Sequence, residues 1–344
     1  MSEQLEAVLA HLDATHDAQI ERLCDLLRIA SVSTDPAHTD DVRKAAECCC
    51  GYLNAGGFTA TVRDTTGHPM VVGHVDGPAD APHILYYGHY DVQPPDPIDL
   101  WDTAPFEPTI VDGKNGPKIV ARGASDDKGQ LMMFVEALRA WNEVGGGIPV
   151  RATILLEGEE ESGSPSLDPF LEANADELRP DVCIVSDTGM WDTNTPAITT
   201  MLRGMVYLEA TLHGPSHDLH SGMCGGAVVN PINALCRILG DLHDENGRIA
   251  ISGFYDGIID PSEAQHAQWI ELGFDEAAFL AEVGLPESTG EVGRSVLERI
   301  WCRPTLDVNG IYGGYTGDGA KTVIPSHATT KFSCRLVPGQ DPDA

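Results

Sequence analysis

Short apolar runs alternate with a helical pattern in the N-terminal part of this 344-residue chain. The runs with the length and composition of strands are Phe58–Val62, Ile84–Tyr87, Thr153–Leu156 and Val182–Val185. Between the second and third of them, Lys128–Trp141 repeats its apolar residues at helical spacing. Strand–helix–strand order predicts an α/β sheet covered by helices, in which ligands gather at the carboxyl ends of strands.

Polar, metal-binding residue types follow the apolar runs at the points where the strands end. The four tips are Gly88-His89-Tyr90-Asp91 after Ile84–Tyr87, Asp126-Asp127 after Ile119-Val120, Glu157 to Ser164 after Thr153–Leu156, and Ser186-Asp187 after Val182–Val185. One imidazole among several carboxylates suits divalent zinc, cobalt or manganese. Carboxylates gathered at one sheet edge would repel each other unless a cation or protons neutralised them.

Each tip has an ordinary structural interpretation when it is taken singly. A lone histidine after a strand is more often a surface or core residue than a ligand. Asp126-Asp127 before a helix is typical of an N-cap, and Glu159-Glu160-Glu161 is typical of a solvated loop. Four such segments in order, each directly after an apolar strand, favour a metal site over these separate interpretations.

The charge of the chain excludes one class of function. With 53 acidic against 21 basic residues, the chain would be repelled by a phosphate backbone, so we expect no nucleic-acid partner. No run of 18 apolar residues predicts a membrane span, and the acidic N-terminus lacks the pattern of a secretory signal. The nine cysteines show no disulfide or zinc-finger spacing, which favours reduced thiols and a cytoplasmic location.

The pattern changes near residue 199. Met201–His213 predicts a longer strand, Pro231–Asp244 a helix and Lys331–Val337 another strand. We therefore expect a domain boundary at Ala197–Thr200, between a domain 1–198 and a domain 199–344.

Three long motifs carry a family resemblance. They are Tyr87-Gly88-His89-Tyr90-Asp91-Val92-Gln93-Pro94, Gly123-Ala124-Ser125-Asp126-Asp127-Lys128-Gly129 and Glu160-Glu161-Ser162-Gly163-Ser164. The chain thereby resembles the dipeptidase and carnosinase-like members of the two-zinc peptidase and deacylase family, which also includes succinyl-diaminopimelate desuccinylase and acetylornithine deacetylase. The resemblance implies an α/β fold with a three-layer α/β/α catalytic domain. Into that domain an α+β lid, which also makes a homodimer, would be inserted.

The same resemblance implies roles for single residues. His89 and Asp187 would bind one zinc, Asp126 would bridge both ions, and Glu161 would bind the second. Glu160 would be the general base. Asp91 matches the carboxylate behind the histidine ligand, where it would fix the tautomer of the ring.

The second domain carries matching motifs of its own. They are Gly214-Pro215-Ser216-His217-Asp218-Leu219-His220-Ser221-Gly222, Lys321-Thr322-Val323-Ile324-Pro325 and Arg335-Leu336-Val337-Pro338. The resemblance implies that His220 reaches the partner subunit's active site and stabilises the oxyanion. Thr322 and Arg335 would hold the substrate, with Arg335 on a free carboxylate. Without the resemblance, a surface salt bridge would explain Arg335.

The implied activity is metal-assisted hydrolysis of dipeptides or small peptides with two divalent ions, zinc in the first place and manganese or cobalt as alternatives. Two alternatives remain: an N-acyl amino acid deacylase on the same scaffold, or a non-catalytic peptide-binding dimer. The family also places a last histidine ligand near its C-terminus, which this sequence lacks. We therefore expect a C-terminally truncated chain that is inactive by itself.

Overall fold

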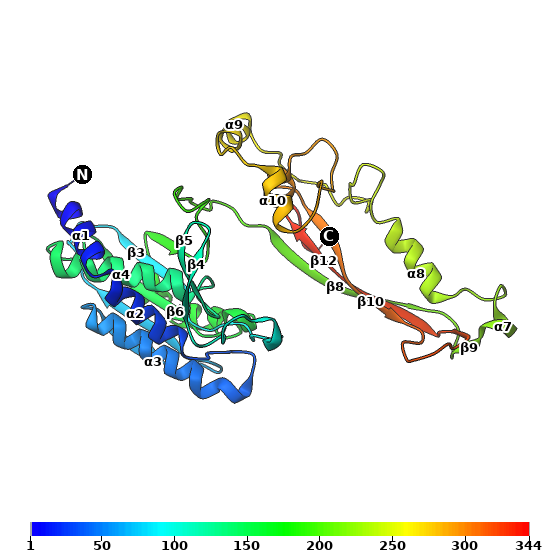
Figure 1. The fold of residues 1–344 in the computed structure, drawn as a ribbon, viewed down its shortest axis with the longest axis horizontal. Coiled ribbons are helices and arrows are strands. Elements are labelled where there is room, and N and C mark those ends of the chain that lie inside the picture. Colours follow the sequence, from blue (N-terminus) through cyan, green and yellow to red (C-terminus); the bar gives the residue numbers. More distant parts are fainter. Residues whose placement is uncertain (1, 344) are drawn as a thin grey trace. The chain divides into compact units, whose positions relative to one another are not determined.

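The computed structural model describes residues 2–343. The chain folds into two compact units, Met1–Ile198 and Thr199–Ala344 (Figure 1). Each unit has its own sheet, its own helices and its own hydrophobic core.

A five-stranded sheet of order β1-β2-β6-β3-β7 forms the centre of the first unit. Its strands are β1 (Thr59–Arg63), β2 (Met70–Val75), β3 (His83–His89), β6 (Arg151–Glu157) and β7 (Val182–Val185). β3 runs parallel to both β6 and β7, whereas β1 and β2 are antiparallel to their neighbours. The carboxyl ends of β3, β6 and β7 therefore meet at one edge of the sheet.

The two faces of this sheet are buried by different helices. On one face, alternate residues such as Tyr86, Ile154 and Leu156 join a core with residues of α2, α3 and α4. On the other face, Leu85 and Leu155 pack with residues of α5 and α6. The helices are α1 (Glu3–Ala14), α2 (His16–Leu27), α3 (Thr39–Ala55), α4 (Lys128–Val144), α5 (Leu167–Ala173) and α6 (Ala175–Leu178). The unit is thus a helix–sheet–helix sandwich.

One of the four predicted strand tips does not belong to this sheet. Ile119-Val120 ends β5 (Gly116–Val120), which pairs only with β4 (Thr109–Gly113) in a two-stranded hairpin. The expectation that this strand lies in the central sheet was wrong. Asp126 instead reaches the sheet edge through the segment that leads from β5 into α4.

The other three tips and the helix were predicted correctly. Ile84–Tyr87, Thr153–Leu156 and Val182–Val185 lie in β3, β6 and β7, and Lys128–Trp141 lies in α4. The buried strand β2 was not predicted, because Gly73 and His74 interrupt its short apolar run. A side chain at Gly73 would lie 3.3 Å from Leu53, so glycine lets α3 approach the strand.

The second unit is built on a three-stranded antiparallel sheet of order β10-β12-β8. Its strands are β8 (Gly204–His213), β10 (Thr305–Gly313) and β12 (His327–Leu336). Helix α8 (Pro231–Gly240) packs against β12 and β8, with Pro231 at its first position and the Asn230 side chain accepting the Ile232 N–H. A short pair, β9 (Leu219–His220) and β11 (Val323–Ile324), extends the unit.

The remaining short elements complete the chain. In the second unit they are α7 (Ser221–Cys224), α9 (Glu263–Glu271), α10 (Glu276–Glu282) and α11 (Val296–Trp301). In the first unit they are the 3-10 turns Pro36–His38, Ile98–Leu100 and Glu160–Ser162. Relative to the predictions, β8 begins three residues later than Met201, β12 begins before Lys331, and α8 ends before Asp244.

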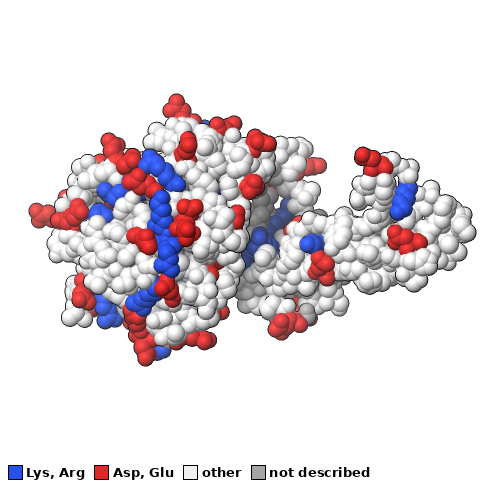
Figure 2. Space-filling model, turned by 90° about the horizontal axis from the view of Figure 1, so that it is seen from below, with Lys and Arg blue, Asp and Glu red and all other residues white. Residues whose placement is uncertain are grey.

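The excess acidic charge lies on the surface. On the face shown in Figure 2, acidic side chains stand in small groups, several of them beside a band of basic side chains. This arrangement agrees with a solvated acidic exterior. Within residues 2–343, no helix combines the length and the apolar character needed to cross a membrane.

Candidate metal centre

His89 ends β3 and is completely buried. Its Nδ1 lies 3.1 Å from the carbonyl oxygen of Asp91 and 3.4 Å from the carboxylate of the same residue. Both partners are acceptors, so Nδ1 carries a proton, and in the neutral form of the ring Nε2 would be the bare nitrogen. This Nε2 is buried and has no hydrogen-bond partner among the described residues. A buried ring nitrogen without a partner can serve as a metal ligand once a cation displaces its proton.

Three carboxylates from different segments surround the His89 Nε2. It lies 3.2 Å from Asp126 Oδ1, 3.9 Å from Asp187 Oδ2 and 4.0 Å from Glu160 Oε2. The ligand atoms of His89, Asp126 and Asp187 all lie within 4.8 Å of one another. Ligands of one zinc ion at about 2.0–2.2 Å lie a little over 3 Å apart, so this group fits a divalent cation.

Asp91 connects the histidine to the glutamate loop. Its carboxylate is completely buried and accepts the Glu160 N–H at 3.3 Å and the Glu161 N–H at 3.1 Å. The same carboxylate lies against His89 Nδ1. A single side chain therefore sets both the orientation of the imidazole and the position of the backbone at Glu160 and Glu161.

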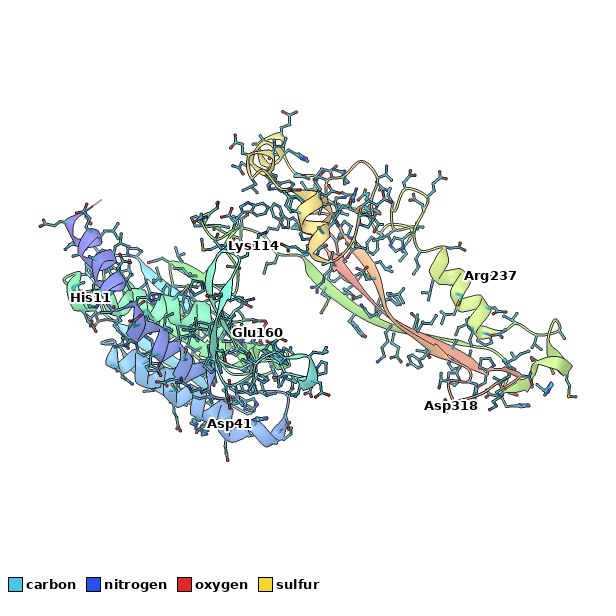
Figure 3. All side chains as sticks on the ribbon, in the orientation of Figure 1. His11, Asp41, Lys114, Glu160, Arg237 and Asp318 are labelled. Atoms are coloured by element: carbon cyan, nitrogen blue, oxygen red, sulfur yellow. The ribbon has the colours of Figure 1, made fainter. Side chains whose placement is uncertain are left out.

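Glu160 and Glu161 begin the 3-10 turn that follows β6, and Figure 3 labels Glu160 on this loop. The Glu160 carboxylate is the one near His89 Nε2. Glu161 lies outside the group formed by His89, Asp126 and Asp187, and its Oε2 accepts a 2.6 Å hydrogen bond from Gln93. The structure thus brings together five of the predicted residues, His89, Asp91, Asp126, Glu160 and Asp187, and holds Glu161 beside them.

Asp127 is buried and occupies the N-cap position of α4, as the Asp-Asp pattern suggested, although its carboxylate does not cap the helix. Its side chain makes no capping bond and instead accepts the His89 N–H at 3.2 Å. A side chain at Gly88 would lie 2.9 Å from this carboxylate, so glycine permits the contact. Burial raises the pKa of Asp127 to about 7.

The charges of the site are unbalanced without a cation. Burial raises the pKa of Glu160 and of Glu161, and the neighbouring acidic groups add to both effects. Burial by itself would lower the pKa of His89, but Asp91 and the other carboxylates outweigh it and raise that pKa to about 10. A metal ion would supply the positive charge that the imidazole provides here, and would favour ionised carboxylates.

In the second unit, His220 and Thr322 lie together and Arg335 lies apart. The His220 Nδ1 accepts the Gly222 N–H at 3.0 Å, and its Nε2 lies 3.2 Å from Thr322 Oγ1. Arg335 sits near the opposite end of β12, and its side chain makes no hydrogen bond or ion pair with the described residues. His327 is the first residue of β12, and Arg335 lies eight residues further along the strand. At roughly 3.3 Å per residue, about 26 Å of strand separates the two within one unit.

Three residues of the centre had no role in the sequence interpretation. Gln93 holds Glu161, Asp127 holds the backbone of His89, and Glu159 is buried behind Glu160. Gln93 and Asp127 lie inside the quoted motifs. Only their contacts in the folded chain distinguish them from surface residues.

The comparisons with known proteins agree with this centre. The model described as "Peptidase family M20/M25/M40" matches residues 85–316. The Cys-Gly metallodipeptidase of Schizosaccharomyces pombe is 33% identical over 99% of this chain and 74% of its own length. The crystal structure of human carnosine dipeptidase 1 is similar with a TM-score of 0.81 and 29% identity. That match covers 99% of this chain and 74% of the human one.

A third relative is named for a different activity. The M20 family metallo-carboxypeptidase of Sulfolobus solfataricus matches with a TM-score of 0.80 and 33% identity, over 94% of this chain and 72% of that one. The chain therefore spans about three quarters of the length of these three relatives.

Proposed function

The chain belongs to peptidase family M20/M25/M40, and from this premise we propose that it is a metal-dependent dipeptidase. The observation that carries the proposal is the buried Nε2 of His89, which has no hydrogen-bond partner within residues 2–343 and faces carboxylates 3.2–4.0 Å away. The dipeptidase names of several relatives support the substrate class. We assign residues 1–198 to the catalytic domain and 199–344 to the lid.

Two divalent ions, zinc in the first place, are the proposed cofactors. His89 and Asp187 would hold one ion, Glu161 the other, and Asp126 would bridge them. Bound there, such ions polarise a scissile carbonyl and acidify the attacking water. Because His89 Nδ1 donates to Asp91, the Nε2 is the nitrogen available for the ion, and Gln93 orients the Glu161 carboxylate.

Glu160 is the proposed general base. It would accept a proton from the attacking water and pass it to the leaving amine. Burial and neighbouring acids raise its pKa, which makes the carboxylate a better proton acceptor than an exposed glutamate. The Asp91 contact to the Glu160 N–H holds the base beside the ligand set.

His220, Thr322 and Arg335 are the proposed substrate contacts. Because the His220 Nδ1 accepts a backbone N–H, a neutral ring carries its proton on Nε2, where it can be donated to an oxyanion. Arg335 has a free guanidinium that suits a carboxylate. Arg335 lies near the end of β12, whereas His220 lies in the separate β9–β11 pair, beyond the start of that strand. We therefore propose that one substrate meets Arg335 of one subunit and His220 of the partner subunit in a homodimer.

Metal dependence and substrate choice test the proposed function. We expect the purified protein to hold about two ions per chain by atomic spectroscopy, as a two-metal site requires. Chelation should stop hydrolysis of Cys-Gly and β-Ala-His, and added zinc, manganese or cobalt should restore it. His89→Ala should lose metal, while His217→Ala, which removes an exposed histidine, should not. A metal-free protein with full activity would reject the proposal.

The same assay separates the alternatives. Faster cleavage of N-acyl amino acids than of dipeptides would favour the deacylase. Binding of dipeptides without turnover, in a metal-loaded dimer, would favour the non-catalytic alternative. Cleavage of longer peptides from their C-terminus would favour the carboxypeptidase activity of the Sulfolobus relative.

A free α-carboxylate is expected to be required because of Arg335. Amidating the C-terminus of a good dipeptide should lower kcat/KM about 10- to 100-fold, the range for a lost hydrogen bond to a charged group. Arg335→Ala should lower kcat/KM for the acid to a similar extent and leave the amide unchanged. Arg237→Ala on α8 is the control, because this arginine is exposed on the same unit (Figure 3). Equal rates for acid and amide would remove Arg335 from its role.

A further inference from the structure

Glu159 directly precedes the proposed base, yet it is 3% exposed and faces away from the ligand set. Its Oε1 accepts the His68 N–H at 2.8 Å, and its Oε2 accepts the Ser166 N–H at 3.1 Å. Both donors are backbone N–H groups, so both partners require an acceptor. Among neutral and acidic side chains of this length, only a carboxylate offers two acceptor oxygens.

The turn that contains His68, the partner of Glu159, is itself held to the core. The His68 ring lies 3.0 Å from the Ser33 carbonyl oxygen, and Thr65 Oγ1 donates to the His68 carbonyl at 2.6 Å. The Tyr90 hydroxyl, which is completely buried, donates to the Pro69 carbonyl. Residues 65–69 therefore form a fixed point between β1 and β2.

The glutamate loop also closes around the backbone of Glu159. Its carbonyl oxygen accepts the Ser162 N–H at 3.1 Å and the Ser164 N–H at 2.8 Å. With its carbonyl and its carboxylate, Glu159 thus ties both ends of the segment 159–166 together and to the turn 65–69. Glu160 and Glu161 lie inside this tied segment.

Gly67 leaves free the space that the Glu159 carboxylate occupies. A Cβ at Gly67 would lie 1.6 Å from Glu159 Oε1 and 2.7 Å from Cδ. The clash is with the far end of a flexible side chain, so an alanine there would displace the carboxylate while the fold persists. The backbone at Gly67 is not in the left-handed region, so alanine adds no strain of its own.

We propose that Glu159 is a positioning residue, which acts through the turn 65–69 to hold Glu160 and Glu161 in place at the metal centre. The proposal rests on the proposed function for the roles of Glu160 and Glu161. On the side of the metal centre, Asp91 holds the loop through the Glu160 and Glu161 N–H groups. On the side of the turn 65–69, Glu159 holds it. Without the contacts of the Glu159 carboxylate, Glu160 and Glu161 would still be present, but their positions at the metal centre would no longer be fixed.

Two variants remove these contacts by different routes. Glu159→Gln replaces one acceptor oxygen with an NH₂ group, which cannot accept the N–H that it faces. Gly67→Ala pushes the carboxylate away and leaves every charged group of the site unchanged. Each is expected to lower metal affinity or kcat about 10- to 100-fold, as for partners that orient metal ligands, with KM changed much less. Their double variant should be no worse than the stronger single one.

The controls are matched to each change. Gly51→Ala lies in α3, where a Cβ would meet nothing within 4 Å, and Glu172→Gln removes an exposed charge on α5. Both should behave as the parent protein does. Circular dichroism and the melting temperature would establish that each variant is folded, and Gly67→Ala keeps the test decisive if Glu159→Gln folds poorly.

Three readouts decide the proposal. They are the zinc dissociation constant by chelator competition, the visible absorption spectrum of the cobalt-loaded protein, and amide hydrogen exchange in residues 158–166. We expect weaker zinc binding, an altered cobalt spectrum and faster exchange in both single variants. Unchanged values in folded variants, or additive effects in the double variant, would overturn the proposal. A parent protein that binds cobalt but splits no dipeptide would reject the proposed function, and these readouts would still test the role of Glu159.

Discussion

Glu160→Gln is expected to keep the fold and the metal content of the protein and to lower kcat about 10²- to 10⁴-fold. The amide has nearly the shape of the carboxylate, so the Asp91 bonds to the Glu160 and Glu161 backbone should persist. An amide cannot take the proton of the attacking water at neutral pH, and the loss should therefore fall on kcat with little change in KM.

Glu172→Gln serves as the control for this measurement, because it makes the same chemical change at an exposed position of α5. Steady-state kinetics and metal analysis of both variants are the required data. Near-normal turnover in a metal-replete Glu160→Gln protein would remove Glu160 from the role of base. Loss of metal together with activity would make Glu160 a ligand.

His220→Ala is expected to lower kcat about 10²- to 10³-fold, the usual effect of removing one oxyanion donor, without changing the metal content. His220 lies in the second unit and its contacts are Gly222 and Thr322, so its removal leaves the carboxylate cluster of the first unit intact.

Mixing His220→Ala with Glu160→Gln tests whether His220 acts in the partner subunit. In a mixed dimer, one site would combine both defects and the other would combine two intact residues. Random exchange of subunits should then restore about a quarter of the parent activity, because half of the dimers are mixed and each has one intact site. Absence of any recovery, in a sample shown to contain mixed dimers, would place His220 in its own subunit's site or outside catalysis.

Periodicity predicted several elements well because their environment is simple. The strands β3 and β6 are short apolar runs covered on both faces, β7 is an apolar run at the exposed edge of the same sheet, and α4 has a continuous apolar stripe. The same rule failed for β5, whose apolar end Ile119-Val120 belongs to a separate hairpin. Alternation of residue types does not say which strand pairs with which, since pairing depends on contacts distant in sequence.

The glutamates at the end of β6 show that residue type also cannot predict the environment of a single side chain. Glu157 and Glu159 are buried, whereas Glu160 and Glu161 are half-buried at the site, although all four lie at or just after the end of β6. Residue type cannot separate them. Their difference arises from the sheet edge, the Asp91 carboxylate and the turn 65–69, each supplied by another part of the chain.

The sequence by itself determined the α/β class of the first unit, the order of its main elements and the set of residue types suited to a divalent metal. Local spacing carries this information, because an apolar strand and the polar residues at its end are neighbours along the chain. Only the tertiary structure decided that His89 Nε2 is left without a partner, that Asp127 and Glu159 hold backbone N–H groups, and that Glu161 is held by Gln93. These contacts join residues up to 91 positions apart, and only the folded backbone brings such donors and acceptors within hydrogen-bond distance.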